Sequence, residues 1–292
     1  MEIFSSIQKT TEFIASLKMN GVTIGFVPTM GALHRGHISL LERAKKENEI
    51  AISSIFVNPL QFNDKKDLEK YPRTLENDTE KLESANCDAL FAPTSEEMYP
   101  SDSSKSNDSD LLNTKEVVVD LGNLDNIMEG KHRPGHFNGV CVVVKKLFDI
   151  IQPDKAYFGE KDFQQLAIIR YIVKILSLPI EIISCPTVRE ADGLAMSSRN
   201  VLLNVDERRN AAHIYKTLKE VKEKAKDMTV LAAINWVEDR ISENPFLQLE
   251  YFEIVNSDTL QAIKSWDESK NIRACIAVKV GAVRLIDNIS LS

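Results

Sequence analysis

The sequence lacks the features that mark several large classes of protein. No uninterrupted apolar run approaches the roughly 20 residues needed to cross a bilayer, so we expect no membrane span. The net charge is −7, whereas proteins that bind nucleic acid broadly rely on an excess of Lys and Arg. We therefore expect a soluble protein with neither a membrane nor a nucleic acid as its partner. A small anionic substrate in a locally basic pocket stays compatible with this charge.

Cysteine is sparse and shows no CxxC spacing; the four residues are Cys87, Cys141, Cys185 and Cys275. Residues 1–20 contain no basic segment followed by an apolar one, as a secretory leader would. We therefore expect a cytoplasmic protein whose thiols stay reduced.

The length and the apolar content are those of a globular protein with more than one core. At 292 residues the chain is long for one compact domain, so we expect two. The apolar content of 43% is ordinary and excludes a disordered or fibrous class.

The stretch GFVPTMGALHRGH, residues 25–37, predicts a strand that runs through a tight turn into a helix starting at His37. Unpaired N–H groups and the positive end of the dipole at a helix start favour a bound anion such as phosphate. Gly31 and Gly36 let the main chain approach a ligand closely. His34 and His37 are placed to donate hydrogen bonds to phosphate oxygens and to balance charge that develops during transfer.

Two histidines three residues apart have other interpretations. They could form half of a metal site, or they could be capping or surface residues. No HExxH signature and no cysteine pair accompanies them, which weakens the metal interpretation. We favour a phosphate-handling turn.

A second strand is predicted over residues 50–58, after a helix over 37–48. Strand–helix–strand units of this kind build a parallel sheet, and ligands gather at the carboxyl ends of its strands. Asn58 and Gln61 lie at that end, where an amide holds a hydroxyl or a carboxylate without adding charge. Asn-Pro is also a common turn dipeptide, so Gln61 is the stronger candidate of the two.

Several other segments are predicted from their local pattern. Residues 1–20 are typical of an amphipathic helix that covers the sheet, and a helix starting near Thr74 precedes a third short strand from Asp88. Residues 101–114 are Ser/Asp-rich and predict an exposed loop, for which we find no function. The basic loop at 129–139 is either a phosphate clamp or a solvated run of charge. Its charged and titratable residues are Lys131, His132, Arg133 and His136.

A second strand-to-helix turn follows the predicted strand DKAYF, which ends at Gly159. Lys161 lies in the first turn of the helix, where the dipole disfavours a cation, so a bound anion explains it better than helix stability does. Asp162 is a natural N-cap, and that role is compatible with a site. Gln165 projects from the first helical turn, at the same rim as Gln61.

After a strand at 180–185 the pattern changes to a polar loop that includes Arg189 and residues 196–199, Met-Ser-Ser-Arg. Hydroxyls and guanidiniums suit the phosphates of a nucleotide, although a surface loop with a helix cap is the alternative. Helices and then strands follow, which predicts a small α+β domain. We therefore expect an α/β protein with a Rossmann-like parallel sheet over 1–186 and a smaller α+β domain over 187–292.

Five motifs occur in order along almost the whole chain: PTMGALHRGH, VNPLQF, EGKHRPGHFNGV, YFGEKDFQQL and VREADGLAMSSRN. The HxGH motif alone is common to the wider nucleotidylyltransferase superfamily. Together with NPLQF and GEKDFQQL, however, it resembles the pantothenate synthetase family. The resemblance implies an AMP-forming ligase that joins pantoate to β-alanine through a pantoyl adenylate, with ATP as co-substrate, Mg²⁺ as cofactor and a homodimeric assembly.

The resemblance also assigns residues. His37 falls at the family's proton-donor position, with His34, Lys161 and Arg199 as the other catalytic candidates. Gln61 and Gln165 would hold pantoate, with Asn58 as a further substrate contact. The ATP site would comprise Met30, Gly31, Ala32, Leu33, His34, Arg35, Gly36, His37, Gly159, Glu160, Lys161, Asp162, Val188, Met196, Ser197, Ser198 and Arg199.

The metal ligand and one histidine are less well defined by the resemblance. Mg²⁺ usually keeps several waters and binds substrate phosphates plus one or two carboxylates, and Asp78 is the candidate carboxylate. Asn77 occupies a place where many relatives carry an acid. His132 falls at a variable place in the family's pattern and is not assigned.

Two other functions fit parts of the sequence. One is a nucleotidyltransferase of the same superfamily that acts on another small acid or phosphate and uses no amine. The other is a nucleotide-binding regulator, which would not require the amides of Gln61 and Gln165. An acyl adenylate is hydrolysed by water, so for the ligase we expect the C-terminal domain to act as a lid.

Overall fold

The computed structural model describes residues 1–100 and 120–292, so the loop predicted at 101–114 lies outside the described residues. The chain forms two compact units. The N-terminal unit comprises Met1–Asp125, Arg133–Gly159 and Gln165–Cys185, and the C-terminal unit comprises Asn126–His132, Glu160–Gln164 and Pro186–Ser292. The C-terminal unit thus includes two short segments that lie far upstream of residue 187. Among the described residues, no helix is long and apolar enough to cross a membrane.

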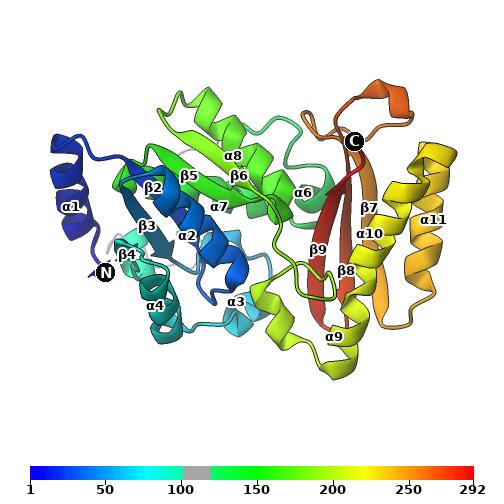
Figure 1. Ribbon diagram of the computed structural model, residues 1–292, viewed down its shortest axis with the longest axis horizontal. Helices are drawn as coiled ribbons and strands as arrows, with labels where there is room; N and C mark the ends of the chain where they lie inside the picture. The colour runs from blue at the N-terminus through cyan, green and yellow to red at the C-terminus, as the bar shows by residue number, and fades with distance from the viewer. Residues whose placement is uncertain (101–119) are drawn as a thin grey trace. The chain divides into compact units, whose positions relative to one another are not determined.

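The N-terminal unit is built on a parallel sheet, six-stranded in the described residues, with the order β1-β4-β3-β2-β5-β6 (Figure 1). The strands are β1 (Glu2–Phe4), β2 (Ile24–Thr29), β3 (Ile50–Ile55), β4 (Ala89–Phe91), β5 (Lys155–Gly159) and β6 (Glu181–Cys185). The prediction of a Rossmann-like parallel sheet is confirmed. Two details of the prediction were wrong: a short edge strand precedes the first helix, and β3 ends three residues earlier than expected.

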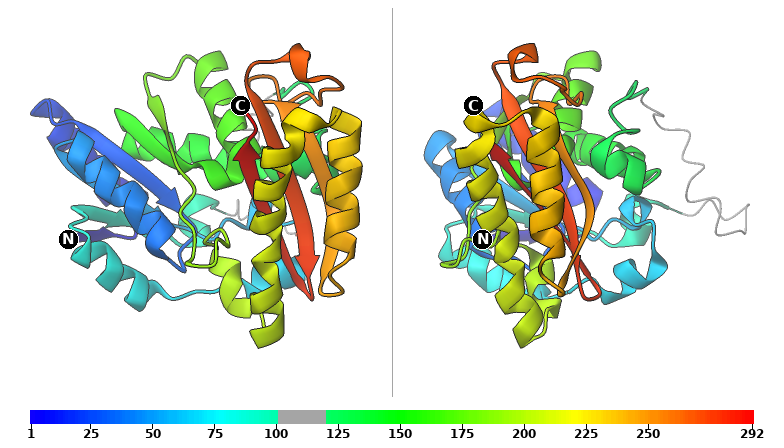
Figure 2. Two further views of the ribbon diagram at one scale, coloured as in Figure 1. Left: turned by 45° about the vertical axis from the view of Figure 1, so that its right-hand side comes forward. Right: turned by 90° about the vertical axis from the view of Figure 1, so that its right-hand side faces the viewer.

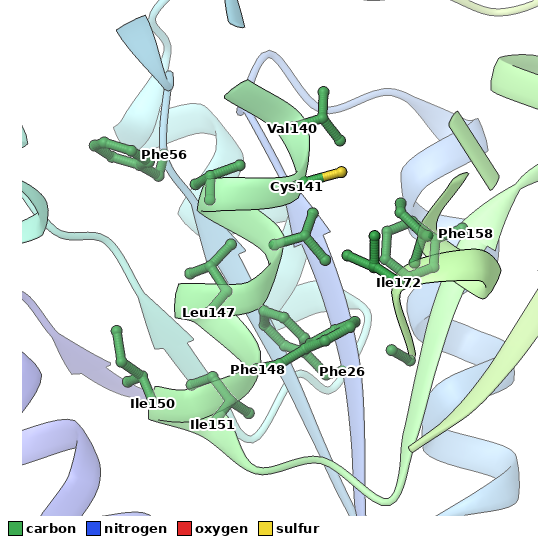
Figure 3. Packing of buried hydrophobic residues seen from close by; sticks show 14 of the residues in the cluster. Phe26, Phe56, Val140, Cys141, Leu147, Phe148, Ile150, Ile151, Phe158 and Ile172 are labelled. Atoms are coloured by element: carbon green, nitrogen blue, oxygen red, sulfur yellow. The ribbon is translucent and has the colours of Figure 1, made fainter. Parts of the chain in front are cut away.

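Alternate residues of the strands pack on opposite faces of this sheet, as the pleat requires. In β2, Phe26 faces one apolar cluster and Val27 the other, and in β5 Phe158 and Tyr157 divide in the same way. The first face is covered by α7 (His136–Ile151) and α8 (Phe163–Ile175), with α1 (Ile7–Met19) packed beside α7. Figure 3 shows side chains of α7, among them Phe148 and Leu147, near Phe26 and Phe158. The other face is covered by α2 (Arg35–Glu47).

Shorter helices connect these elements. In the N-terminal unit they are η1 (Pro59–Gln61), α3 (Lys65–Lys70), α4 (Leu75–Ser84) and α5 (Ser95–Met98). Two more, α6 (Met128–His132) and η3 (Glu160–Asp162), lie between these elements in the chain but belong to the C-terminal unit. The helix expected to start near Thr74 is confirmed as α4, with Thr74 at its N-cap position. All four cysteines are buried.

The C-terminal unit contains an antiparallel sheet in the order β7-β8-β9, formed by β7 (Leu247–Asn256), β8 (Ile272–Val280) and β9 (Val283–Ser290). Two helices, α10 (His213–Lys224) and α11 (Val230–Ser242), lie side by side along this sheet (Figure 2). Their apolar residues, such as Leu218 and Val237, share a core with Ile254 and Ile276 of the strands. The smaller helices of this unit are η4 (Ser198–Leu202), α9 (Val205–Ala211), η5 (Ala225–Asp227) and η6 (Trp266–Glu268).

The two upstream segments join the C-terminal unit through charged and polar contacts. Arg284 of β9 forms a two-bond ion pair with Glu129, at 2.7 and 2.8 Å. The side-chain amide of Asn288 donates to the main-chain oxygens of Glu160 and Lys161, at 2.9 and 3.0 Å. Such contacts between distant segments are not visible in local patterns, which is why the sequence did not predict them.

Candidate active site

The turn between β2 and α2 is closed by two histidines. The Gly36 N–H donates to Nδ1 of His34 at 3.1 Å, and the His34 N–H donates to Nδ1 of His37 at 3.3 Å. His34 is the N-cap of α2 and His37 is its third residue, so the two rings form a capping box. The helix therefore begins at Arg35, two residues before the predicted start at His37.

This capping arrangement sets the proton position on both rings. A neutral imidazole carries one N–H and one bare nitrogen, and a nitrogen that accepts from a main-chain N–H must be the bare one. Because Nδ1 accepts in both His34 and His37, the proton of each neutral ring lies on Nε2. The ring centroids are 4.0 Å apart. The helix start thus presents two neighbouring N–H donors, which is the chemistry that binds phosphate oxygens.

A buried carboxylate holds the preceding turn in place. Asp78 of α4 accepts from the main-chain N–H groups of Ala32 and Leu33, at 2.8 and 2.7 Å, and from the Thr74 hydroxyl at 3.1 Å. Ala32 and Gly31 both have positive φ angles, 49° and 81°, so the turn is a conformation that needs external support. Asp78 supplies that support from a position with no exposed surface.

Asp78 was the candidate ligand for a metal, and the structure gives it a different task. Its two oxygens face donors of the protein itself, and binding a cation there would compete with three hydrogen bonds. In residues 1–100 and 120–292, no group of three or more His, Cys, Asp or Glu side chains is arranged to hold a metal ion. The described residues therefore do not form a dedicated metal cage.

Asn58 lies inside the protein and uses every hydrogen-bonding position of its side chain. Its Oδ1 accepts from the Tyr99 hydroxyl at 3.0 Å and from the Leu60 N–H at 3.3 Å. Its Nδ2 donates to the main-chain oxygen of Gly139 at 3.0 Å and to Oε1 of Gln61 at 3.2 Å. An amide has two donors and two acceptor positions, so none is left for a ligand. In this structure all four positions of the Asn58 side chain are thus bonded to the protein itself, and its contact with substrate stays a prediction.

Gln61 is brought next to the histidine turn. Its Nε2 lies 2.8 Å from Sδ of Met30, the first residue after β2. Its main-chain oxygen contacts Nδ1 of His136 at 2.8 Å, and Nη1 of Arg133 lies 3.0 Å from Nε2 of the same ring. A carbonyl oxygen only accepts, so the His136 proton lies on Nδ1. The structure thus joins Gln61 to the candidate phosphate turn within one unit.

The basic loop at 129–139 is divided between the two units. His136 contacts the main-chain oxygen of Gln61, and Nη2 of Arg133 donates to the same oxygen at 3.4 Å. Lys131 and His132 belong to the C-terminal unit, where the His132 ring stacks on Tyr251 with centroids 5.2 Å apart. The residues of this segment thus divide between two packing environments, and phosphate binding by any of them stays a prediction.

Residues of the C-terminal unit form two further turns that were predicted to bind phosphate. Lys161 lies in η3, with Nζ 3.3 Å from Oδ1 of Asp162. Ser197 caps η4, where its hydroxyl accepts from the Arg199 N–H at 3.3 Å. Arg189 instead forms a two-bond ion pair with Asp287, at 2.7 and 2.9 Å, so this guanidinium has a structural partner.

The predicted site residues divide between the two units. The N-terminal unit contains residues 30–37, Gln61, Gly159 and Gln165, and it brings the histidine turn and Gln61 together. The C-terminal unit contains Glu160–Asp162, Val188 and Met196–Arg199. That both sets bind one ligand stays a prediction.

Comparison with known proteins gives one consistent result. The family described as pantoate-beta-alanine ligase matches residues 2–290. A pantothenate synthetase from Porphyromonas gingivalis is 51% identical over 289 residues, covering 99% of each chain. One from Bacteroides thetaiotaomicron is 50% identical over 289 residues, covering 99% of this chain and 98% of the relative.

Two solved structures are similar over the whole chain. The pantothenate synthetase of Thermus thermophilus has a TM-score of 0.89 at 41% identity, covering 100% of this chain and 99% of that one. A pantoate-beta-alanine ligase from Francisella tularensis, complexed with beta-gamma ATP and beta-alanine, has a TM-score of 0.79 at 36% identity, with 100% and 98% coverage.

Proposed function

Because the chain belongs to the pantoate-beta-alanine ligase family, we propose that it condenses pantoate with β-alanine at the cost of one ATP. An oxygen of the pantoate carboxylate attacks the α-phosphorus, the bond to the bridging oxygen breaks, and pyrophosphate leaves. The amine of β-alanine then attacks the carbonyl carbon of pantoyl adenylate, loses a proton and displaces AMP. The enzyme is thus a ligase that forms a carbon–nitrogen bond. The related ligase from Francisella tularensis, complexed with beta-gamma ATP and beta-alanine, supports this reaction.

The observation that carries the proposal is the pair of Nε2–H donors at the start of α2. In the capping box of His34 and His37, Nδ1 of each ring accepts a hydrogen bond, so the proton of each neutral ring lies on Nε2. In the first step, negative charge builds up on the pyrophosphate oxygens as the bond breaks. Donors fixed before the reaction stabilise this charge without reorganising during it. We assign His37 as the proton donor and His34 as the second phosphate contact.

Gln61 and Gln165 are assigned to pantoate. An amide N–H orients a carboxylate or hydroxyl oxygen but, unlike Lys or Arg, adds no charge that would reduce the nucleophilicity of the carboxylate. The Gln61 amide lies beside Met30 of the histidine turn, which supports a carboxylate held close to the phosphates. Positioning of this kind contributes much of the rate of a two-substrate reaction.

The C-terminal unit is proposed to complete the ATP site and to act as the lid. We assign Lys161, Ser197 and Arg199 to the phosphates. Their cationic and hydroxyl groups match that role, and η3 and η4 hold them on short helical turns. If both units bind one ATP, Lys161→Ala and His37→Ala should each reduce pantoyl adenylate formation from ATP and pantoate.

Three further features belong to the proposal. Mg²⁺ would be held mainly by the ATP phosphates and would neutralise part of their charge, since the described residues form no cage and Asp78 is engaged with main-chain amides. The protein is a homodimer, which size-exclusion chromatography with light scattering would test. It works in the cytoplasm.

The decisive experiment measures AMP and pyrophosphate with ATP and pantoate present, with and without β-alanine. A ligase releases AMP much faster when β-alanine is added and forms pantothenate in equal amount. A nucleotidyltransferase that uses no amine would show no acceleration, and that result would overturn the proposal. Absence of pyrophosphate under all conditions would instead favour a nucleotide-binding regulator.

A further inference from the structure

A chain of buried hydrogen bonds runs from Tyr99 through Asn58 to Gln61. The Tyr99 hydroxyl donates to Oδ1 of Asn58 at 3.0 Å, and Nδ2 of Asn58 donates to Oε1 of Gln61 at 3.2 Å. All three side chains are buried, with exposed fractions of 4%, 1% and 8%. All three also belong to the N-terminal unit.

The donor and the acceptor of each bond in this chain can be assigned, because two of the neighbouring main-chain groups can only accept or only donate. The main-chain oxygen of Gly139 can only accept, so the Asn58 atom beside it must be the NH₂ group. The Leu60 N–H can only donate, so the other Asn58 atom must be the oxygen. The Tyr99 hydroxyl must then donate to that oxygen, and the second Asn58 N–H must point to Gln61.

The orientation of the Asn58 amide determines the orientation of the Gln61 amide. Because Asn58 offers a donor, Gln61 turns its oxygen toward Asn58 and its NH₂ group toward Met30 of the histidine turn. A reversed Gln61 amide would place its oxygen at the turn, where it would repel a carboxylate oxygen instead of binding it. The two ends of this amide differ little in shape, so a hydrogen-bond partner, not packing, selects the orientation.

We propose that Tyr99 is a positioning residue for the ligase reaction, which acts through Asn58 to keep the NH₂ group of Gln61 directed at the acceptor oxygens of pantoate. The inference rests on the proposed assignment of Gln61 to pantoate. Without the hydroxyl, Oδ1 of Asn58 keeps only the 3.3 Å bond from Leu60. Asn58 keeps its polarity through Gly139 and Leu60, but it is held in place by one bond fewer, so its bond to Gln61 weakens and the NH₂ group of Gln61 is directed less precisely. Tyr99 itself touches no substrate in this scheme.

The hydroxyl is suited to a fixed donor role. Burial raises the pKa of Tyr99 well above its ordinary value, so the proton stays on the oxygen across the working pH range. The position of the ring is set by apolar neighbours, with the Phe56 ring centroid 6.0 Å away. Tyr99→Phe therefore removes the donor and leaves the packing in place.

The test is a double-mutant cycle in the full-length enzyme with Tyr99→Phe, Gln61→Ala and the pair. For Tyr99→Phe we expect the pantoate KM to rise about 3- to 10-fold, the loss of one buried hydrogen bond, with the ATP KM changed less than about 2-fold. In the Gln61→Ala background, Tyr99→Phe should raise the pantoate KM no further, because its effect passes through Gln61. A residue that only stabilises the fold would not show this dependence.

Tyr157→Phe is the matched control. Tyr157 is also fully buried in the N-terminal unit, and its hydroxyl also bonds to an asparagine side chain, that of Asn48 at 2.8 Å. It lies away from Gln61 in the hydrogen-bond network, so this variant should lose stability and keep its pantoate KM. If Tyr99→Phe does not fold, Asn58→Ala takes its place in the cycle with the same expectation.

The outcomes distinguish the role of Tyr99 from the assignment of Gln61 to pantoate. A Tyr99→Phe enzyme whose pantoate KM matches that of the wild type, or whose effect adds fully to that of Gln61→Ala, overturns the role of Tyr99 alone. An unchanged pantoate KM in Gln61→Ala removes Gln61 from pantoate binding and overturns both.

Discussion

Replacing Gly139 by alanine adds only one methyl group, yet we expect it to disturb the site strongly. It lies in α7, where the helix passes the segment that carries Gln61. A Cβ atom at this position would lie 2.2 Å from the main-chain oxygen of Leu60 and 2.8 Å from the main-chain nitrogen of Gln61. Main-chain atoms cannot rotate away as a side chain can, so Gly139→Ala must push the helix and the segment apart.

The size of the effect follows from this distance. A carbon and a carbonyl oxygen rarely approach closer than roughly 3.3 Å, so the two elements must separate by about 1 Å. Overpacking of this kind costs up to ~3 kcal/mol, and the better helix propensity of Ala returns ~1 kcal/mol, for a net loss of about 2 kcal/mol. The same shift would lengthen the 3.0 Å bond from Asn58 to Gly139 beyond hydrogen-bonding range. We expect kcat/KM for pantoate to fall about 10- to 100-fold.

Urea denaturation gives the change in free energy of unfolding, and initial rates of AMP release at varied pantoate give kcat/KM. Asp149→Ala on the exposed side of the same helix is the control. It also introduces alanine but removes only a surface ion pair with Lys145, so it should change stability by less than about 0.5 kcal/mol. A Gly139→Ala enzyme that is as stable as the wild type and uses pantoate equally well would refute the close-approach reasoning.

Asp78→Asn replaces one carboxylate oxygen, which accepts from main-chain N–H groups, by an NH₂ group that cannot accept. The ATP KM should therefore rise at least about 10-fold, and an unchanged KM would show that the turn keeps its conformation without Asp78. Burial raises the pKa of Asp154, but the hydrogen bonds from the Ile24 N–H and Lys18 outweigh it and lower the pKa overall. This stabilisation is complete above the unfolded pKa of roughly 4 and is lost as the pH falls through the lower folded pKa. Asp154→Asn should therefore unfold more easily than wild type at pH 7, and the difference should shrink as the pH falls through the folded pKa; a difference in urea denaturation that stays constant on acidification would contradict this. His37→Ala should lower kcat about 10²- to 10³-fold in the AMP-release assay, and a fully active variant would remove it from catalysis.

The local patterns of the sequence were sufficient for the main elements. The strand and glycine-containing turn of residues 25–37, the strand over 50–58 and the strand-to-helix turn after Gly159 are all predicted from neighbouring residues. Periods of 2 and 3.6 residues report which side of a strand or helix is apolar, and the order of elements then restricts the topology to a parallel sheet. The motifs also identified the family, since residue types at fixed spacing are local information.

The site was predicted less completely. The sequence singled out His34, His37, Asn58 and Gln61, but it could not predict that Asn58 is bonded on all sides within the protein, because an amide at the rim of a sheet looks the same whether it faces a ligand or the protein. It gave no signal for Tyr99 or Gly139, since a buried tyrosine and a helical glycine have many ordinary explanations.

What the sequence alone determined, then, is the kind of chemistry available at the carboxyl end of the sheet: imidazoles, amides and a helix start that suit phosphate and carboxylate oxygens. Only the tertiary structure decided which atom of each side chain points where. Asp78 meets the turn at Ala32, and Tyr99 meets Asn58, across 46 and 41 residues of chain. Hydrogen-bond direction depends on the partner, and partners this distant in sequence are brought together only by packing of the whole unit.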